Sequence, residues 1–225
     1  MKQLRLNPVR DAVFSAIHAD LRAEALQEFL KNGADIFIMA GALRDAIAAY
    51  YGGEGAGDPR DFDVAVANIS REIFDEVLSP LGRRNRHGGY VLSILGTPNW
   101  DVWRLEETIG LKKTGASCSL ENVLRSFNLN CNAVALNIRT GLFLDAGAID
   151  AIRHQRLGFA EDAIRHSTDT FAAKALLLHL RSGYHLTEDM ERFIAANLHS
   201  SSLLYETAKV FPDAAALPIP YSPES

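Results

Sequence analysis

The sequence has little cysteine and no long apolar run. Its 225 residues include two cysteines, Cys118 and Cys131, whose spacing fits neither a zinc motif nor a disulfide framework, so we expect two plain thiols. No stretch approaches the 18 apolar residues of a membrane-spanning helix, and charges interrupt each apolar stretch near the N-terminus. We therefore expect a cytoplasmic protein with no membrane partner.

An excess of positive charge is also missing. The chain has 23 Lys and Arg against 28 Asp and Glu, a formal net charge of −5, whereas free-standing polyanion binders are normally basic. One dense basic cluster stands out, formed by Arg83, Arg84, Arg86 and His87. It could contact the phosphates of an acceptor, or it could be a solvated loop. Hydrophobic residues make up 48% of the chain, enough for a large core.

Several common catalytic motifs are absent from the sequence. There is no G-x-x-x-x-G-K-[ST] phosphate loop and no G-x-G-x-x-G dinucleotide fingerprint. Neither H-E-x-x-H nor G-x-S-x-G occurs, which disfavours a zinc protease and an α/β-hydrolase.

The apolar periodicity predicts a mixed α/β head followed by a helical extension. Residues 106–122 are expected to be irregular, and the chain after Ala146 is expected to be helical. The predicted helices are 10–31, 42–51, 73–78, a long one through 171–181, and 188–198; the predicted strands are 36–39, 62–67, 90–95, 100–103, 132–138 and 142–144.

Three aspartates on predicted strands are the first chemical signal. Asp61 and Asp63 alternate on one strand, so both carboxylates point to the same face, while Phe62 points to the other. A neighbouring strand could add Asp101, which lies between two tryptophans. Carboxylates held together repel unless a cation neutralises them, and Mg²⁺ prefers carboxylate and phosphate oxygens. The alternative is that these acids are solvated strand residues.

A turn of small residues precedes the aspartates. Gly41 and Ala42 follow a predicted buried strand and open a helix that carries Arg44 and Asp45. Small side chains let phosphate oxygens approach the backbone N–H groups at a helix N-terminus. The plainer interpretation is a tight strand-to-helix turn with an Arg–Asp surface pair.

In this order the motifs resemble those of the class II CCA-adding enzyme and bacterial poly(A) polymerase family, within the nucleotidyltransferase superfamily. That family carries G-G-x-V-R-D and then D-x-D; here the residues are A-G-A-L-R-D from Ala40 and D-F-D from Asp61. R-S-F-N-L-N-C-N-A from Arg125 is similar to the family's R-D-F-T-x-N-A, with Ser126 in place of the acid. E-D-A-I-R from Glu161 matches E-D-x-x-R, and 145–150 and 171–174 resemble neighbouring segments.

The resemblance implies a fold, a reaction and a set of roles. The fold would be α/β (α+β), a nucleotidyltransferase head with a mixed twisted sheet over 1–146, a helical neck over 147–211 and a loose tail over 212–225. Catalysis would transfer an NMP from an NTP, such as ATP, to an acceptor hydroxyl and release pyrophosphate. The expected catalytic and Mg²⁺- or Mn²⁺-binding residues are Asp61, Asp63 and Asp101, and the expected nucleotide-binding residues are Gly41, Ala42, Arg44, Asp45, Arg125, Asp162 and Arg165.

In the family the E-D-x-x-R motif lies in the neck and reads the incoming base. Asp162 and Arg165 are three residues apart, so on a helix they would share a face and could pair with a base edge. Two other functions stay open. The chain could be a nucleotide-binding regulatory or toxin–antitoxin-type protein without turnover, or it could modify a short RNA end, a small molecule or a protein. The sequence also allows a homo-oligomer.

Overall fold

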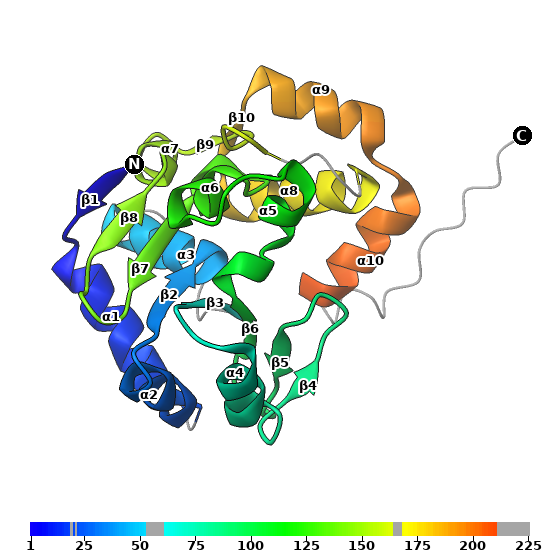
Figure 1. The fold of residues 1–225 in the computed structure, drawn as a ribbon. Helices are drawn as coiled ribbons and strands as arrows, with labels where there is room; N and C mark the ends of the chain where they lie inside the picture. The colour runs from blue at the N-terminus through cyan, green and yellow to red at the C-terminus, as the bar shows by residue number, and fades with distance from the viewer. Residues whose placement is uncertain (19, 21, 53–60, 164–167, 211–225) are drawn as a thin grey trace, which may run out of the picture.

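The chain folds around a central mixed sheet, described by a computed structural model that covers residues 1–18, 20, 22–52, 61–163 and 168–210 (Figure 1). In the described part, eight strands lie in the order β1-β8-β7-β2-β3-β6-β5-β4. These strands are β1 (Lys2–Leu4), β2 (Asp35–Met39), β3 (Asp61–Ala67), β4 (Arg83–Arg84), β5 (Tyr90–Leu92), β6 (Asn99–Arg104), β7 (Val134–Asn137) and β8 (Phe143–Asp145).

Helices flank the sheet and continue beyond it. The α-helices are α1 (Asn7–His18), α2 (Ala23–Lys31), α3 (Ala40–Tyr50), α4 (Arg71–Leu78), α5 (Ile109–Thr114), α6 (Leu120–Arg125), α7 (Ala148–Arg153), α8 (Thr168–Ser182), α9 (Glu188–Asn197) and α10 (Ser200–Val210). Two 3₁₀ turns, η1 (Leu105–Glu107) and η2 (Asn130–Asn132), precede α5 and β7, and two short strands, β9 (Arg156–Leu157) and β10 (His185–Leu186), pair in parallel.

The central sheet contains both parallel and antiparallel strand pairs. Among the described strands β3 and β6 run parallel, and every other neighbouring pair in the eight-stranded sheet is antiparallel. A parallel pair needs a crossover connection, and α4 with the β4–β5 hairpin supplies it. The predicted mixed sheet is therefore confirmed, as are the predicted strands at its centre.

One face of the sheet carries the larger apolar core. Phe62, Val64 and Val66 alternate along β3 and are buried on this face beside Ile36 and Ile38 of β2. Each fully buried side chain of this size stabilises the fold by about 1.5–3 kcal/mol. Helices α1 to α4 pack against these strands through Val9, Val13, Phe29, Leu43, Ile47, Phe74 and Leu78.

The opposite face is covered over only part of its length. Ala65 and Ala67 at the end of β3 lie under Leu111 of α5 and under Val123 and Leu124 of α6. Alanine on this face leaves room for the two short helices. At the start of β3 the same face carries Asp61 and Asp63 instead, because side chains two residues apart point the same way.

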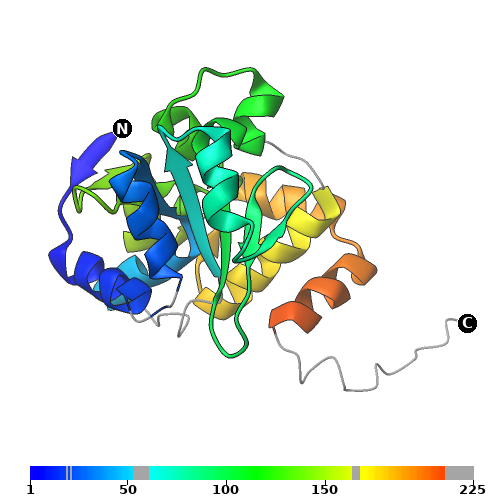
Figure 2. The same ribbon diagram turned by 60° about the horizontal axis from the view of Figure 1, so that its bottom comes forward.

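The C-terminal helices pack beside the sheet and on one another. Phe171 of α8 and Phe193 of α9 form an aromatic cluster with Phe159, and α10 lies along α8 (Figure 2). Ser202 of α10 donates a hydrogen bond of 2.8 Å to Asp169. Residues of α7 and α8 share one apolar cluster with the sheet, and the division at residue 146 between head and neck stays a prediction.

The single helix predicted for residues 10–31 is wrong, since α1 ends at His18 and α2 begins at Ala23. Arg22 lies between them and is buried, and the side chain of its partner Asp20 is only 7% exposed. The guanidinium donates to Asp20, to the carbonyl oxygen of Leu92 at 2.6 Å and to that of Pro98 at 2.7 Å. These hydrogen bonds fix the segment between α1 and α2 to the end of β5 and the loop that follows it. The spacing of apolar residues in the sequence gives no sign of them.

Two further expectations about secondary structure are wrong. Residues 106–122 contain α5 and the first half of α6, and the few apolar residues of these two helices pack on Ala65 and Ala67 of β3. The chain after Ala146 includes β9 and β10, which are too short to show a strand pattern. The predicted tail over 212–225 lies outside the described residues. No described helix has the length and apolar character needed to span a bilayer.

Candidate active site

The aspartates of β3 and β6 meet at the uncovered end of the sheet. Parallel pairing places Asp63 directly opposite Asp101, and Asp61 opposite Asn99. Asp63 and Asp101 both line a pocket of about 390 Å³. The structure thus brings Asp101 to the Asp61–Asp63 strand, as the sequence predicted, while their chemical role stays a prediction.

The pocket lies between these carboxylates and segments from four other parts of the chain. They are the turn between β4 and β5, the stretch from η1 into α5, the residues after α6, and the first half of α8. Its volume is within the range of small-molecule sites, about 300–1,000 Å³. The remaining lining residues are Asn85, His87, Gly89, Trp103, Glu107, Thr108, Ile109, Gly110, Lys113, Ser126, Phe127, Asn128, Thr170, Phe171 and Lys174.

The carboxyl group of Asp101 has an unusual electrostatic setting. Burial raises its pKa above the ordinary value, and the negative charge of Asp61 raises that pKa further. A hydrogen bond of 3.1 Å from Asn85 Nδ2 to Asp101 Oδ1 and the charge of His87 act in the opposite direction without cancelling the rise. A bound cation would favour the ionised forms of Asp61 and Asp101 together.

Asn85 connects Asp101 to the turn that closes one side of the pocket. Its side-chain oxygen accepts hydrogen bonds from the backbone N–H groups of His87, at 2.9 Å, and Gly89, at 3.1 Å. A Cβ atom on Gly89 would lie 2.5 Å from the carbonyl oxygen of Val102, so only glycine fits this close to β6. The turn is therefore fixed to the strand that carries Asp101.

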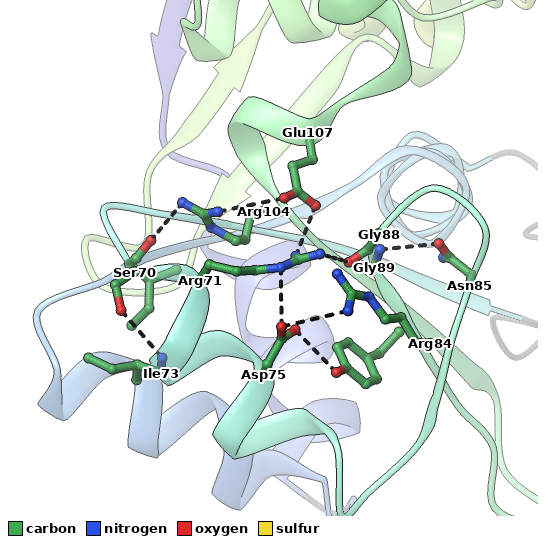
Figure 3. Close-up of polar contacts among 12 residues, drawn as sticks. Ser70, Arg71, Ile73, Asp75, Arg84, Asn85, Gly88, Gly89, Arg104 and Glu107 are labelled. Atoms are coloured by element: carbon green, nitrogen blue, oxygen red, sulfur yellow. Dashed lines mark hydrogen bonds and ion pairs between the residues drawn. The ribbon is translucent and has the colours of Figure 1, made fainter.

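An ionic network behind the turn holds it from the other side (Figure 3). Arg71 of α4 donates to Glu107 Oε2 at 3.0 Å and to the carbonyl oxygen of Gly88 at 2.9 Å, and its Nε lies 3.2 Å from Asp75. Arg104 lies 3.6 Å from the second oxygen of Glu107. Glu107 lines the pocket, so two arginines fix a third pocket carboxylate besides Asp63 and Asp101.

The A-G-A-L-R-D motif lies outside this pocket. Helix α3 begins at Ala40, two residues earlier than predicted, and Arg44 is buried beneath its first turn. Arg44 Nε donates to Asp45 at 2.7 Å, and Nη1 donates to the side-chain oxygen of Asn132 at 3.0 Å. Burial acts to lower the pKa of Arg44, but the charge and hydrogen bond of Asp45, together with Cys131 and Tyr184, outweigh it, so the pKa is raised. Within the described chain, neither Arg44 nor Asp45 is among the pocket residues, nor are Gly41 and Ala42.

Arg125 joins the segment after α6 to the E-D-A-I-R motif. Its Nε donates to Asp162 and its Nη2 to Glu161, both at 2.8 Å, and the Asp162 N–H donates to the Arg125 carbonyl oxygen at 3.0 Å. The structure therefore brings Arg125 and Asp162 together beside the pocket residues Ser126 to Asn128. Arg165, the fourth residue after Glu161, lies outside the described residues.

The two cysteines are free thiols, as predicted. Cys118 is exposed, and Cys131 is buried against Arg44, where burial raises the pKa of its thiol to about 11. Among the residues that the structure describes, no group of three or more His, Cys, Asp or Glu side chains could hold a metal ion by itself. A Mg²⁺ site here would therefore rely on fewer carboxylates and on substrate phosphate oxygens, a common arrangement for this ion.

Sequence reasoning missed the residues around the carboxylates. Asn85 lies inside the basic cluster but was not singled out, and Glu107, Lys113 and Lys174 lie in segments without a motif. The one available signal was Arg86-His87-Gly88-Gly89, a polar turn directly before a strand. Its closeness to Asp101 follows from the β5–β6 pairing, which the sequence does not specify.

Solved structures share this fold. A CCA-adding enzyme in complex with ATP matches 94% of this chain with a TM-score of 0.63 at 15% identity, and the match covers 51% of that chain. The Thermotoga maritima CCA-adding enzyme complexed with tRNA matches 93% of this chain and 51% of its own, with a TM-score of 0.63 at 14% identity. A tRNA-processing enzyme complex matches 81% of this chain and 50% of its own, with a TM-score of 0.60 at 16% identity.

The likeness defines the class of fold. The chain shares the fold of solved CCA-adding enzymes, as the motif order predicted, and it spans about half the length of the solved chains it matches. No protein-family model matches the sequence, and no curated protein matches it. The likeness therefore concerns the fold, and the reaction has to be argued from the site.

Proposed function

We propose that this chain is a metal-dependent nucleotidyltransferase, which transfers an NMP from an NTP to an acceptor hydroxyl and releases pyrophosphate. The observation that carries the proposal is the position of Asp63 opposite Asp101, with Asp61 on the same face, at the floor of a nucleotide-sized pocket. Solved structures of this fold include complexes named for ATP and for CTP, which supports an NTP as the substrate.

The carboxylates fit a divalent cation. Burial, and after it the like charge of Asp61, raise the pKa of Asp101, and a bound cation would favour the ionised carboxylate. Because no three carboxylates among the described residues form a metal-binding group by themselves, each Mg²⁺ or Mn²⁺ ion would be held by one or two of Asp61, Asp63 and Asp101 and by phosphate oxygens of the substrate. When bound, such an ion neutralises charge on the phosphates and polarises the phosphorus that is attacked.

The side chains around the floor position the reacting groups. Asn85 orients the carboxylate of Asp101 by its hydrogen bond, and Glu107 is fixed by Arg71. The acceptor oxygen forms a bond to the α-phosphorus while the bond to the leaving pyrophosphate breaks, and the hydroxyl proton is released. In-line attack of this kind depends on positioning and charge stabilisation more than on covalent chemistry.

The nucleotide would extend from the floor toward the neck. By resemblance, Arg125 lies near the ribose, and Asp162 with Arg165 faces the base. The bond between Arg125 and Asp162 supports this assignment because it places both side chains at one end of the segment that lines the pocket. By resemblance also, Gly41, Ala42 and Asp45 support the phosphate end. The acceptor is unassigned among a short RNA end, a small molecule and a protein.

One observation favours a second function, nucleotide binding without turnover in a regulatory or toxin–antitoxin-type protein. Ser126 lines the pocket where the resembling family has an acid, and its hydroxyl donates to the carbonyl oxygen of Val123 at 2.8 Å. This position therefore contributes no carboxylate to the pocket.

The two functions are separated by one experiment. The protein is incubated with each of the four NTPs labelled at the α-phosphate, with Mg²⁺ or EDTA, and with or without a pool of short RNAs. Labelled acceptor and pyrophosphate that depend on Mg²⁺ support the transferase. Saturable NTP binding with no labelled product supports the regulatory alternative, and no NTP binding overturns both.

A further inference from the structure

Arg44, which the family resemblance assigns to nucleotide binding, already has partners inside the fold. Arg44 is 7% exposed, and its guanidinium bonds to Asp45 and Asn132 inside the fold. Its place beneath the first turn of α3 is separate from the described residues that line the pocket. A polyphosphate in the pocket would therefore need cations other than Arg44.

The pocket has cations of its own on its rim. Lys113 projects from α5 and Lys174 from α8, and both line the pocket together with His87. Both lysines are exposed, and the structure shows no ion pair or hydrogen bond from either ammonium group to another described residue. The acids of the floor, Asp63 and Asp101, come from the sheet, so the pocket joins an acidic floor to a basic rim.

We infer that Lys113 of α5 and Lys174 of α8 bind the β- and γ-phosphates of the NTP. The inference rests on the proposed function for the identity of the ligand. A polyphosphate suits both ends of such a pocket. Some of its oxygens can coordinate a divalent cation held by the carboxylates, and others can accept hydrogen bonds from the ammonium groups at the rim. Lysine suits this place, since its compact charge on a long stem can follow a phosphate.

Most exposed lysines are merely solvated, and the neighbouring Lys112 provides the comparison. It is exposed on the same short helix as Lys113 and carries the same charge, but it is not among the pocket residues. General charge attraction would make Lys112 and Lys113 equivalent, whereas a specific phosphate contact would distinguish them.

The test measures binding of inorganic tripolyphosphate, which has no base and so does not depend on NTP preference. Titrations with the full chain, with and without Mg²⁺, compare wild type with Lys113→Ala, Lys174→Ala, the double variant and Lys112→Ala. Each single variant at the rim is expected to weaken binding about tenfold, as for one charge-assisted contact, and the double variant further. Lys112→Ala should bind as wild type does, and Lys113→Arg should retain most of the affinity.

The outcomes separate this inference from the proposed function. Equal affinity of the double variant and wild type, or equal losses in Lys112→Ala and Lys113→Ala, would overturn the lysine assignment even if the protein transfers nucleotides. Loss of tripolyphosphate binding in the rim variants, in a protein with no transfer activity, would support the assignment and reject the transferase. Circular dichroism of each variant confirms that the fold is kept.

Discussion

Asp63 and Asp101 occupy directly opposed positions on the parallel strands β3 and β6. Parallel pairing needs a crossover connection, and α4 with the β4–β5 hairpin forms this connection between the two strands. The same hairpin places Asn85 beside Asp101. The connection that creates the carboxylate pair therefore also supplies the group that orients it.

Replacing Asn85 by aspartate should impair transfer. The variant loses the N–H donor to Asp101 and adds a like charge, so the pKa of Asp101 should rise further. If transfer needs ionised Asp101, its rate increases as pH rises through this pKa, so in the variant the increase should occur at higher pH. At pH 7 the variant should lose at most about tenfold in rate. The measurement is a pH–rate profile of pyrophosphate release.

Asn137→Asp is the matched control for that change, because Asn137 lies in the distant β7–β8 hairpin and uses its oxygen as an acceptor, which aspartate keeps. An Asn85→Asp profile that overlays those of wild type and the control would show that Asn85 does not position Asp101.

Replacing Gly41 by alanine separates a backbone requirement for phosphate from a requirement for folding. A Cβ atom at this position would meet only Arg44 side-chain atoms, at 3.8 and 4.0 Å, which is ordinary contact. Alanine in place of glycine in a helix should raise the free energy of unfolding by about 0.5–1 kcal/mol. If phosphate oxygens approach this backbone, transfer should nevertheless fall. Urea unfolding and initial rates measure the two effects, and a more stable variant with full activity would remove Gly41 from the site.

Much of the fold and part of the site can be predicted from the sequence, for identifiable reasons. Strand β2 is a continuous apolar run in the sequence, and β3 begins with alternating acidic and apolar residues. This alternation alone puts Asp61 and Asp63 on one face. The turn of Asn85 and the lysine rim could not be predicted, because their positions depend on strand pairing and on short helices without apolar periodicity. The burial of Arg44 could not be predicted either, since a motif match does not reveal that its side chain is bonded to Asp45 and Asn132 inside the fold.

Arg125→Ala should change nucleotide preference more than stability. The ion pairs of Arg125 with Glu161 and Asp162 involve partly exposed side chains, so their loss should lower the free energy of unfolding by less than about 1 kcal/mol. Without Arg125, Asp162 loses its fixed orientation, and relative rates with the four NTPs should shift. An NTP profile identical to wild type would leave the Arg125–Asp162 bond as a purely structural link.

The buried pair of Asp20 and Arg22 should control stability in acid. Burial acts to raise the pKa of Asp20, but hydrogen bonds from the Arg22 side chain and backbone and the Arg22 charge outweigh it, so the pKa is lowered. The stabilisation is therefore present above the ordinary pKa of 3.8 and is lost as pH falls through the lower, folded value. Arg22→Met should cost about 3 kcal/mol at pH 7 and less below pH 3.8.

Urea unfolding at pH 7 and at pH 3 tests this dependence. Arg192→Met is the control, because Arg192 pairs with Glu188 and Asp189 on the surface and should contribute less than about 1 kcal/mol at pH 7. An Arg22→Met penalty that is equally large at both pH values would contradict the role of the Asp20 charge.

The most direct test of the account is the rate of Mg²⁺-dependent NMP transfer by Asp63→Asn, compared with Asp35→Asn. Asp35 begins β2 and Asp63 is the third residue of the adjacent strand β3, but Asp35 accepts a hydrogen bond from Asn68 and lies outside the pocket of Asp101. The account predicts that Asp63→Asn folds normally and loses transfer by at least about a thousandfold, while Asp35→Asn retains it. Wild-type transfer by a folded Asp63→Asn variant would contradict the assignment of the reaction to this site.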